Sequence, residues 1–140
     1  MAKKNAVSVE AAGWLRKAVK HILAEPRRYD QDRTLMKVEP GKQFYYTTIG
    51  AYKAPACGTV GCLAGWVTAL SLPLDESMRV EPVSYASDKL GLNPYQRDTL
   101  FGVVERWPTK YSDQYCAAKT PKQVARVAAR RVEHFIKTGE

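Results

Sequence analysis

The 140-residue sequence predicts a mainly α fold, a single compact domain of about five helices with at most one small β-hairpin at residues 35–49. Three observations lead to this fold class. Apolar residues recur at helical spacing in several segments. Residues that cap helices precede these segments, and proline or glycine follows them. A chain of this length is typical of one domain, so we expect residues 1–140 to fold together, with a flexible basic tail at residues 1–6.

The expected helices follow from their start and stop signals. Pro26 ends the first one, because proline disfavours the helical conformation in the residue before it. Asn93 with Gln96, and Thr120 with Gln123, have the spacing of a capping box, which marks a helix start. The pattern at residues 111–118 is ambiguous. The expected helices span residues 8–24, 59–72, 82–90, 93–107 and 120–137.

Two short strands are expected after the first helix. Residues 35–38 and 44–49 have the apolar, aromatic and β-branched side chains that strands favour. Pro40 and Gly41 between them have the order of a type II turn. An irregular aromatic loop is the alternative, because two strands alone are marginally stable.

Composition limits the class of function. The sequence has no apolar run long enough to span a membrane and no signal peptide, so we expect a cytoplasmic protein without a membrane partner. Three cysteines, an odd number, suit a reducing compartment. The net charge of +8 divides into +6 for residues 1–60, −3 for residues 61–105 and +5 for residues 106–140. Basic chain ends favour an anionic partner, although solubility alone also explains them.

Residues 57–66, Cys-Gly-Thr-Val-Gly-Cys-Leu-Ala-Gly-Trp, are the most informative stretch. They are typical of a loop that runs into a helix, with Thr59 as the N-cap. Gly61 and Gly65 would then share one helical face, where each glycine costs roughly 1 kcal/mol relative to alanine. A close approach of another helix or of a ligand would offset this cost.

The cysteines could in principle serve a metal or a reaction. The spacing of Cys57 and Cys62 falls outside the usual interval of zinc ligands, so we expect no metal site and no cofactor. A helix start would lower the pKa of Cys62, but no recognisable motif surrounds either histidine. We therefore interpret Cys57, Cys62 and Cys116 as small buried thiols and expect no enzymatic activity.

The glycine stretch and the aromatic segment before it predict a site for a small anionic ligand such as a nucleotide. Backbone N–H groups at a helix start bind phosphate, aromatic rings stack on a base, and nearby cations neutralise charge. The alternatives are close helix packing through the glycines and burial of the rings in the core. The expected ligand-binding residues are Gly58, Thr59 and Gly61 for the phosphate, Tyr45, Tyr46 and Tyr52 for the base, and Lys53, Arg27 and Arg28 for the charge.

The last helix offers a second anion-binding surface. Lys122, Arg126, Arg130 and Arg131 would contact a nucleic-acid backbone, and such binding would weaken with salt. A solvated charged face is the other interpretation. The sequence has no helix-turn-helix or zinc-finger pattern, so we do not expect sequence-specific recognition.

The order of motifs resembles a family of small proteins of bacteria and their phages. They share a Cys-Gly-Thr-x-x-Cys-x-Ala-Gly core, found here at residues 57–65, after a helix that ends in proline, here Pro26. Leu-Gly-Leu follows at residues 90–92 and Trp-Pro at residues 107–108, so the resemblance covers roughly residues 20–110. No activity is established for this family.

The resemblance implies a phage or prophage setting, inside a bacterial host cell. Short proteins of this kind often act by binding. We therefore expect a non-enzymatic binding protein that sequesters a small phosphate-bearing ligand, such as a nucleotide signal of host defence. The alternative is a basic interaction protein that binds nucleic acid or inhibits a host protein, and either could be an oligomer.

Overall fold

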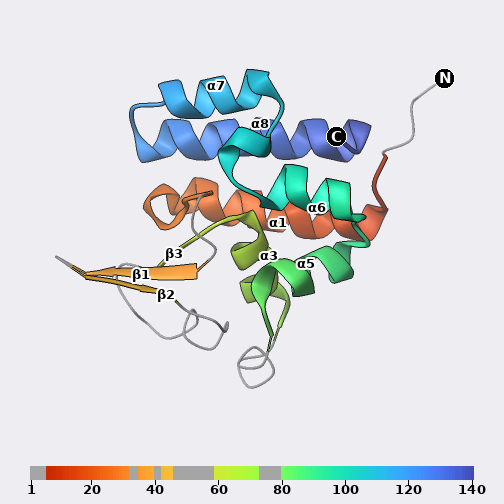
Figure 1. Ribbon diagram of the computed structural model, residues 1–140, viewed down its shortest axis with the longest axis horizontal. Coiled ribbons are helices and arrows are strands. Elements are labelled where there is room, and N and C mark those ends of the chain that lie inside the picture. The colour runs from red at the N-terminus through yellow and green to blue at the C-terminus, as the bar shows by residue number, and fades with distance from the viewer. Residues whose placement is uncertain (1–5, 32–34, 40–41, 46–58, 73–79) are drawn as a thin grey trace.

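A computed structural model of the protein describes residues 6–31, 35–39, 42–45, 59–72 and 80–140 (Figure 1). The α-helices are α1 (Val9–Ala24), α3 (Leu63–Ser71), α5 (Pro82–Leu90), α6 (Pro94–Phe101), α7 (Thr109–Ala117) and α8 (Pro121–Thr138). Two 3₁₀ turns are η1 (Pro26–Arg28) and η2 (Val104–Arg106). The strands, described by their backbone, are β1 (Leu35–Glu39), β2 (Lys42–Tyr45) and β3 (Thr59–Gly61).

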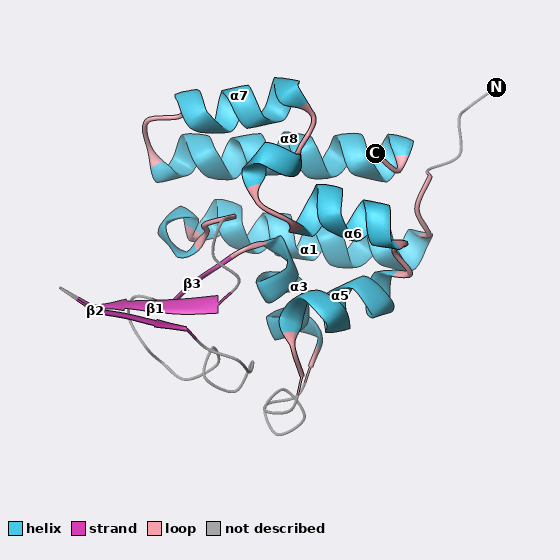
Figure 2. Cartoon of the chain, viewed as in Figure 1, coloured by secondary structure: helices cyan, strands magenta, loops and turns pink. Residues whose placement is uncertain are grey.

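The mainly α class is confirmed (Figure 2). Helices α7, α8 and α1 lie side by side, α3, α5 and α6 lie against them, and the small sheet stands at one end (Figure 1). Helices α1 and α8 run antiparallel. The N–H of Ala6 donates to the carbonyl of Ile136 at one end of the pair (3.1 Å), so the chain is already attached at residue 6. At the other end, η1 lies beside the start of α8.

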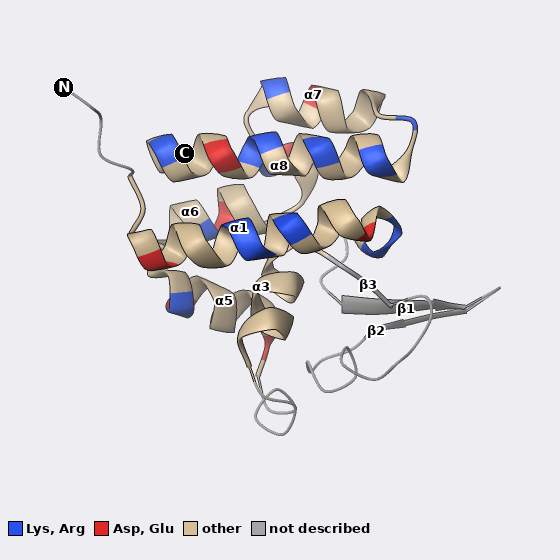
Figure 3. Cartoon of the chain, turned by 180° about the vertical axis from the view of Figure 1, so that it is seen from behind, with Lys and Arg blue, Asp and Glu red and all other residues tan. Residues whose placement is uncertain are grey.

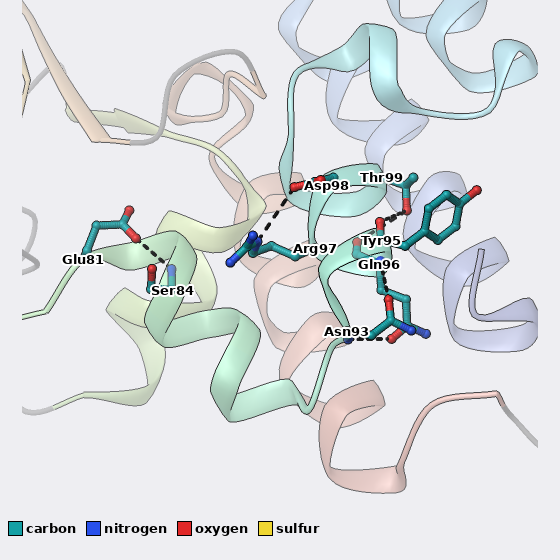
Figure 4. Close-up of polar contacts among 8 residues, drawn as sticks. All are labelled: Glu81, Ser84, Asn93, Tyr95, Gln96, Arg97, Asp98 and Thr99. Atoms are coloured by element: carbon teal, nitrogen blue, oxygen red, sulfur yellow. Dashed lines mark hydrogen bonds and ion pairs between the residues drawn. The ribbon is translucent and has the colours of Figure 1, made fainter.

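Local capping fixes the helix ends, as the sequence predicts. The side chain of Thr120 accepts from the N–H of Gln123 in a complete capping box, and Gly139 ends α8 at a φ of 74°. Asn93 and Gln96 form the second capping box, at the start of α6 (Figure 4). Residues 111–118, whose sequence pattern is ambiguous, lie almost entirely in helix α7. The predicted end of the helix that begins after Asn93 is wrong: α6 ends at Phe101, well before Pro108, and η2 follows as a separate turn.

The predicted hairpin exists and has a third strand. Its second strand begins at Lys42, two residues before the predicted start, and residues 40–41 and 46–49 of the prediction lie outside the described residues. Strand β1 pairs antiparallel with β2 on one side and with β3 on the other, giving the order β2-β1-β3. Met36 faces Tyr45 in one pairing and Val60 in the other. Thr59 therefore belongs to a strand, and the prediction that it caps a helix is wrong. The backbone of the β-branched pair at residues 59–60 is satisfied by β1 rather than by a helical turn.

A single hydrophobic core joins the helices. Apolar residues recur along the inner faces of α1 and α8, where Leu15, Ile22 and Phe135 are fully buried. Helix α3 is buried from Leu63 to Ala69, so it runs through the interior. Gly65 is buried inside this helix, whereas Gly61 lies in β3. The predicted helical row of glycines is therefore wrong, because the helix begins only after Cys62.

Candidate functional site

The start of α3 is closed by the protein itself. Cys62, at the N-cap, is only 1% exposed, and Leu63 and Ala64 are fully buried. The N–H of Leu63 donates to the side-chain oxygen of Gln31 at 3.3 Å. The first free N–H group of this helix thus has a partner, which removes one donor that a phosphate at this helix start would need.

Burial also decides the chemistry of Cys62. Desolvation raises the pKa of its thiol to about 11, and the backbone N–H groups of Ala64 and Gly65 lower this pKa less. At neutral pH the group is a thiol and not a nucleophilic thiolate. The interpretation of Cys62 as a small buried thiol is confirmed. Cys116, in contrast, is exposed, so its predicted burial is wrong.

Gln31 is a buried residue that sequence analysis missed. Its side-chain oxygen accepts from the hydroxyl of Tyr29 as well as from Leu63, at 3.0 and 3.3 Å. Its side-chain nitrogen donates to the carbonyls of Leu100 and Gly102, at 3.1 and 2.9 Å. Three of these four hydrogen bonds tie the segment after η1 to α3 and to the end of α6, and the fourth, with Tyr29, lies within the segment. A lone polar residue in a charged connection carries no sequence signal of such a role.

The predicted ligand-binding residues fall into two groups. Thr59 and Gly61 lie in β3 and Tyr45 lies in β2, where the structure gives their backbone alone. Arg27 and Arg28 lie in η1, and a hydrogen bond attaches this turn to α3. The indole N–H of Trp66 donates to the carbonyl of Arg28 at 3.0 Å, and the Arg28 guanidinium lies 5.2 Å from the centre of the same indole ring. The predicted positions outside the described residues are Gly58, Tyr46, Tyr52, Lys53 and Cys57.

The antiparallel arrangement of α1 and α8 creates a cleft between η1 and the start of α8. Its volume is about 470 Å³, within the range of small-molecule sites. Arg27, Arg28 and Lys122 supply three cations to its wall. The sequence assigned the first two to a small ligand and the third to nucleic acid, and the fold brings all three together. The complete lining is Glu25, Pro26, Arg27, Arg28, Thr120, Pro121 and Lys122.

The cations of this cleft differ in how far they are neutralised. Arg28 forms an ion pair with the carboxylate of Glu25 at 3.1 Å. The same carboxylate lies 3.6 Å from Nε2 of His21, whose pKa is lowered chiefly by burial. Arg27 and Lys122 have no ion pair within the described part of the chain. Two of the three cations therefore keep their full charge for an anion.

A second hollow lies on the α7 side of α8, whereas the cleft lies on its η1 side. The volume of this hollow is about 360 Å³, and it lies between α7 and α8. Oε1 of Gln114 accepts from both Nε and Nη2 of Arg130, at 3.2 and 3.0 Å. The complete lining is Gln114, Ala117, Ala118, Gln123, Arg126, Val127 and Arg130. Figure 3, which views the molecule from behind, shows Lys and Arg positions in blue along α8 and α1.

Arg131 is not part of this surface, and the prediction that it contacts a nucleic acid is wrong. Its side chain is 0% exposed. Nη2 donates to the carbonyl of Thr99 at 2.9 Å, while Nε and Nη1 are buried without a partner in the described structure. Burial lowers the pKa of its guanidinium to about 10. The sequence contained a sign of this burial: Arg131 lies four residues from Val127 and from Phe135, and both lie on the buried face of α8.

Comparison with known protein families, with curated proteins and with solved structures finds no match. Within the described residues, no three side chains of His, Cys, Asp or Glu gather as a metal site would require. None of the described helices has the length and apolar character needed to cross a membrane. The cleft and the hollow beside α8 are therefore interpreted from their own chemistry.

Proposed function

We propose that this protein is a non-enzymatic binding protein that holds a small phosphate-bearing ligand, such as a nucleotide, in the cleft between η1 and α8. The observation that carries the proposal is the meeting of Arg27, Arg28 and Lys122 around a cleft of about 470 Å³. These cations come from segments more than ninety residues apart. A site shared by two such segments needs the folded protein.

The chemistry of the cleft suits a nucleotide. Arg27 and Lys122 are free of ion pairs within the described part of the chain, so a phosphate gains charge-assisted hydrogen bonds without breaking any. The guanidinium of Arg28 lies over the indole of Trp66 and lines the same cleft as Arg27 and Lys122. The rings of Pro26 and Pro121 add apolar surface on which a base can lie.

The two side chains of the cleft that could act as a base or a nucleophile are Glu25 and Thr120, and their contacts favour binding without catalysis. The carboxylate of Glu25 is engaged with Arg28. The hydroxyl of Thr120 accepts the N–H of Gln123 at 3.2 Å in the capping box. A hydrolase would need a base and a nucleophile within hydrogen-bond reach of each other, and these two groups serve structural contacts instead.

Calorimetric titration with a panel of linear and cyclic nucleotides tests this function. We expect one molecule bound per chain, and a fall in affinity of about a hundredfold or more in the double variant Arg27→Gln/Lys122→Gln, because hydrogen bonds to charged groups contribute about 1.5–3 kcal/mol each. Lys137→Gln, at the other end of α8, is the matched control. The absence of binding heat across the panel would refute the proposal.

Sequestration of a nucleotide signal of host defence is the biological role we propose for this binding, on the resemblance to bacterial and phage proteins. The alternative, a basic protein that binds nucleic acid or inhibits a host protein, is supported by the exposure of Arg126 and Arg130 on α8. A steep loss of affinity for nucleic acid with rising salt, together with no binding of mononucleotides, would favour the alternative.

A further inference from the structure

The wall of the η1 cleft contains one carboxylate, Glu25, among the described residues that line it. We infer that this carboxylate binds the base of the ligand and selects guanine, so that the site takes a guanine nucleotide rather than nucleotides in general. The inference rests on the proposed function, because the phosphate stays with the cations of the cleft and only the choice of base is new.

A carboxylate beside an anion-binding site needs a partner on the ligand. The charged side chains of the cleft are Arg27, Arg28 and Lys122 against Glu25 alone. The cations attract a phosphate, whereas the carboxylate repels one. A ligand therefore suits the whole wall if it carries an anion at one end and hydrogen-bond donors at the other. A nucleotide whose base has donor groups on its edge meets both conditions.

The carboxylate of Glu25 keeps acceptor capacity for such donors. Oε2 accepts from Nη1 of Arg28 at 3.1 Å, and Nε2 of His21 lies 3.6 Å from the same oxygen. Oε1 has no partner in the described part of the chain. Each oxygen of an ionised carboxylate accepts about two hydrogen bonds, so both oxygens can accept another. The side chain is 48% exposed, so a ligand can reach them.

Glu25 also lies next to a surface on which a base can rest. Pro26 follows it directly, and both residues line the cleft. Their Cα atoms are about 3.8 Å apart, which is less than the width of a purine. One base can therefore place its face on the ring of Pro26 and its edge against the carboxylate of Glu25.

The pattern of donors on the base makes guanine the best partner. Guanine alone among the common bases has two adjacent donors on its Watson–Crick edge, N1–H and the N2 amino group, and they match the two oxygens of one carboxylate. Adenine and cytosine place a ring nitrogen with a lone pair beside their amino group, and uracil places carbonyls on both sides of N3–H. A carboxylate would face these acceptors and be repelled. A two-pronged pair of this kind discriminates between bases by roughly tenfold or more.

Calorimetric titration with the monophosphates of guanosine, inosine, adenosine, cytidine and uridine tests the inference. We expect the guanosine nucleotide to bind at least tenfold more tightly than the adenosine nucleotide. Inosine should lie between them, because its base keeps N1–H and lacks the N2 amino group. The deoxy form of the guanosine nucleotide should bind equally well. Equal affinities for all bases, or a preference for ribose alone, would overturn the inference and leave the proposed function intact.

The variant Glu25→Gln tests the role of the carboxylate. The ratio of guanosine to adenosine nucleotide affinity should fall from at least ten to about one, because an amide offers one acceptor and one donor. This ratio is insensitive to the release of Arg28, which affects the phosphate of both nucleotides alike. Glu105→Gln, an exposed position in η2 that does not line the cleft, removes the same charge and should keep the ratio.

Far-UV circular dichroism checks that both variants fold. An unchanged preference for guanosine in Glu25→Gln would overturn the inference while the proposed function stands. Failure of all five nucleotides to bind the unaltered protein would overturn both.

Discussion

The substitution Arg131→Met should stabilise the protein. The guanidinium of Arg131 is fully buried, and within the described part of the chain only its Nη2 has a hydrogen-bond partner, the carbonyl of Thr99 at 2.9 Å. Each buried donor without a partner costs about 1–3 kcal/mol, and Nε and Nη1 are two such donors. Methionine has a similar length, removes both donors, and gives up one hydrogen bond from a charged group, about 1.5–3 kcal/mol. We therefore expect a net gain of about 1–3 kcal/mol in the free energy of unfolding.

Urea unfolding followed by circular dichroism measures this gain. The midpoint should rise with an unchanged m-value, and the melting temperature should rise by about 4 °C per kcal/mol for a chain of this length. Arg131→Lys is the control, because it keeps the buried charge but shortens the reach to Thr99, and it should destabilise. A methionine variant that is less stable than the wild type by more than about 1 kcal/mol would refute the reasoning, since the buried charge would then be a net stabilising group.

Three further predictions concern buried groups away from the cleft. Gln31→Leu should lower the free energy of unfolding by about 3 kcal/mol or more, because it removes the partner of the N–H of Leu63 and of the carbonyl of Gly102. Urea unfolding measures this loss, and a loss below about 1 kcal/mol would contradict the role of this amide. Burial lowers the pKa of His21 below its unfolded value of 6.5, so the unfolded chain binds more protons than the folded one as the pH falls. The contribution of neutral His21 to stability is therefore present above pH 6.5 and is lost as the pH falls below it. The unfolding midpoints at about pH 7.5 and pH 5 should differ less in His21→Phe than in the wild type. Cys62 should resist iodoacetamide at pH 8 until denaturant is added, while Cys116 is alkylated in the native protein; peptide mass spectrometry distinguishes the two, and native alkylation of Cys62 would show that its burial is wrong.

Features set by neighbouring residues were predictable from the sequence. The capping boxes that begin α6 and α8 involve residues three apart, so their signal is local. Gly91 ends α5 in the left-handed conformation, at a φ of 66°, for the same reason. The helical class and most helix boundaries depend on such signals.

Features set by distant residues were not predictable. Thr59 has the properties of an N-cap, but the antiparallel register with β1, more than twenty residues earlier, places it in a strand. The capping of α3 by Gln31 depends on tertiary packing alone. The cleft needs Arg27 and Lys122 side by side, and only the antiparallel contact of α1 with α8 brings them together. The sequence therefore named several of the cations but assigned them to two different ligands.

The position of the ligand is the central claim, and an NMR titration of ¹⁵N-labelled protein with the tightest-binding nucleotide tests it most directly. We expect the largest shift changes in the backbone amides of residues 25–28 and 120–124, on both sides of the cleft, with small changes at the C-terminal end of α8. Changes centred on residues 44–61 would instead place the ligand at the aromatic and glycine-rich segment and would contradict this account.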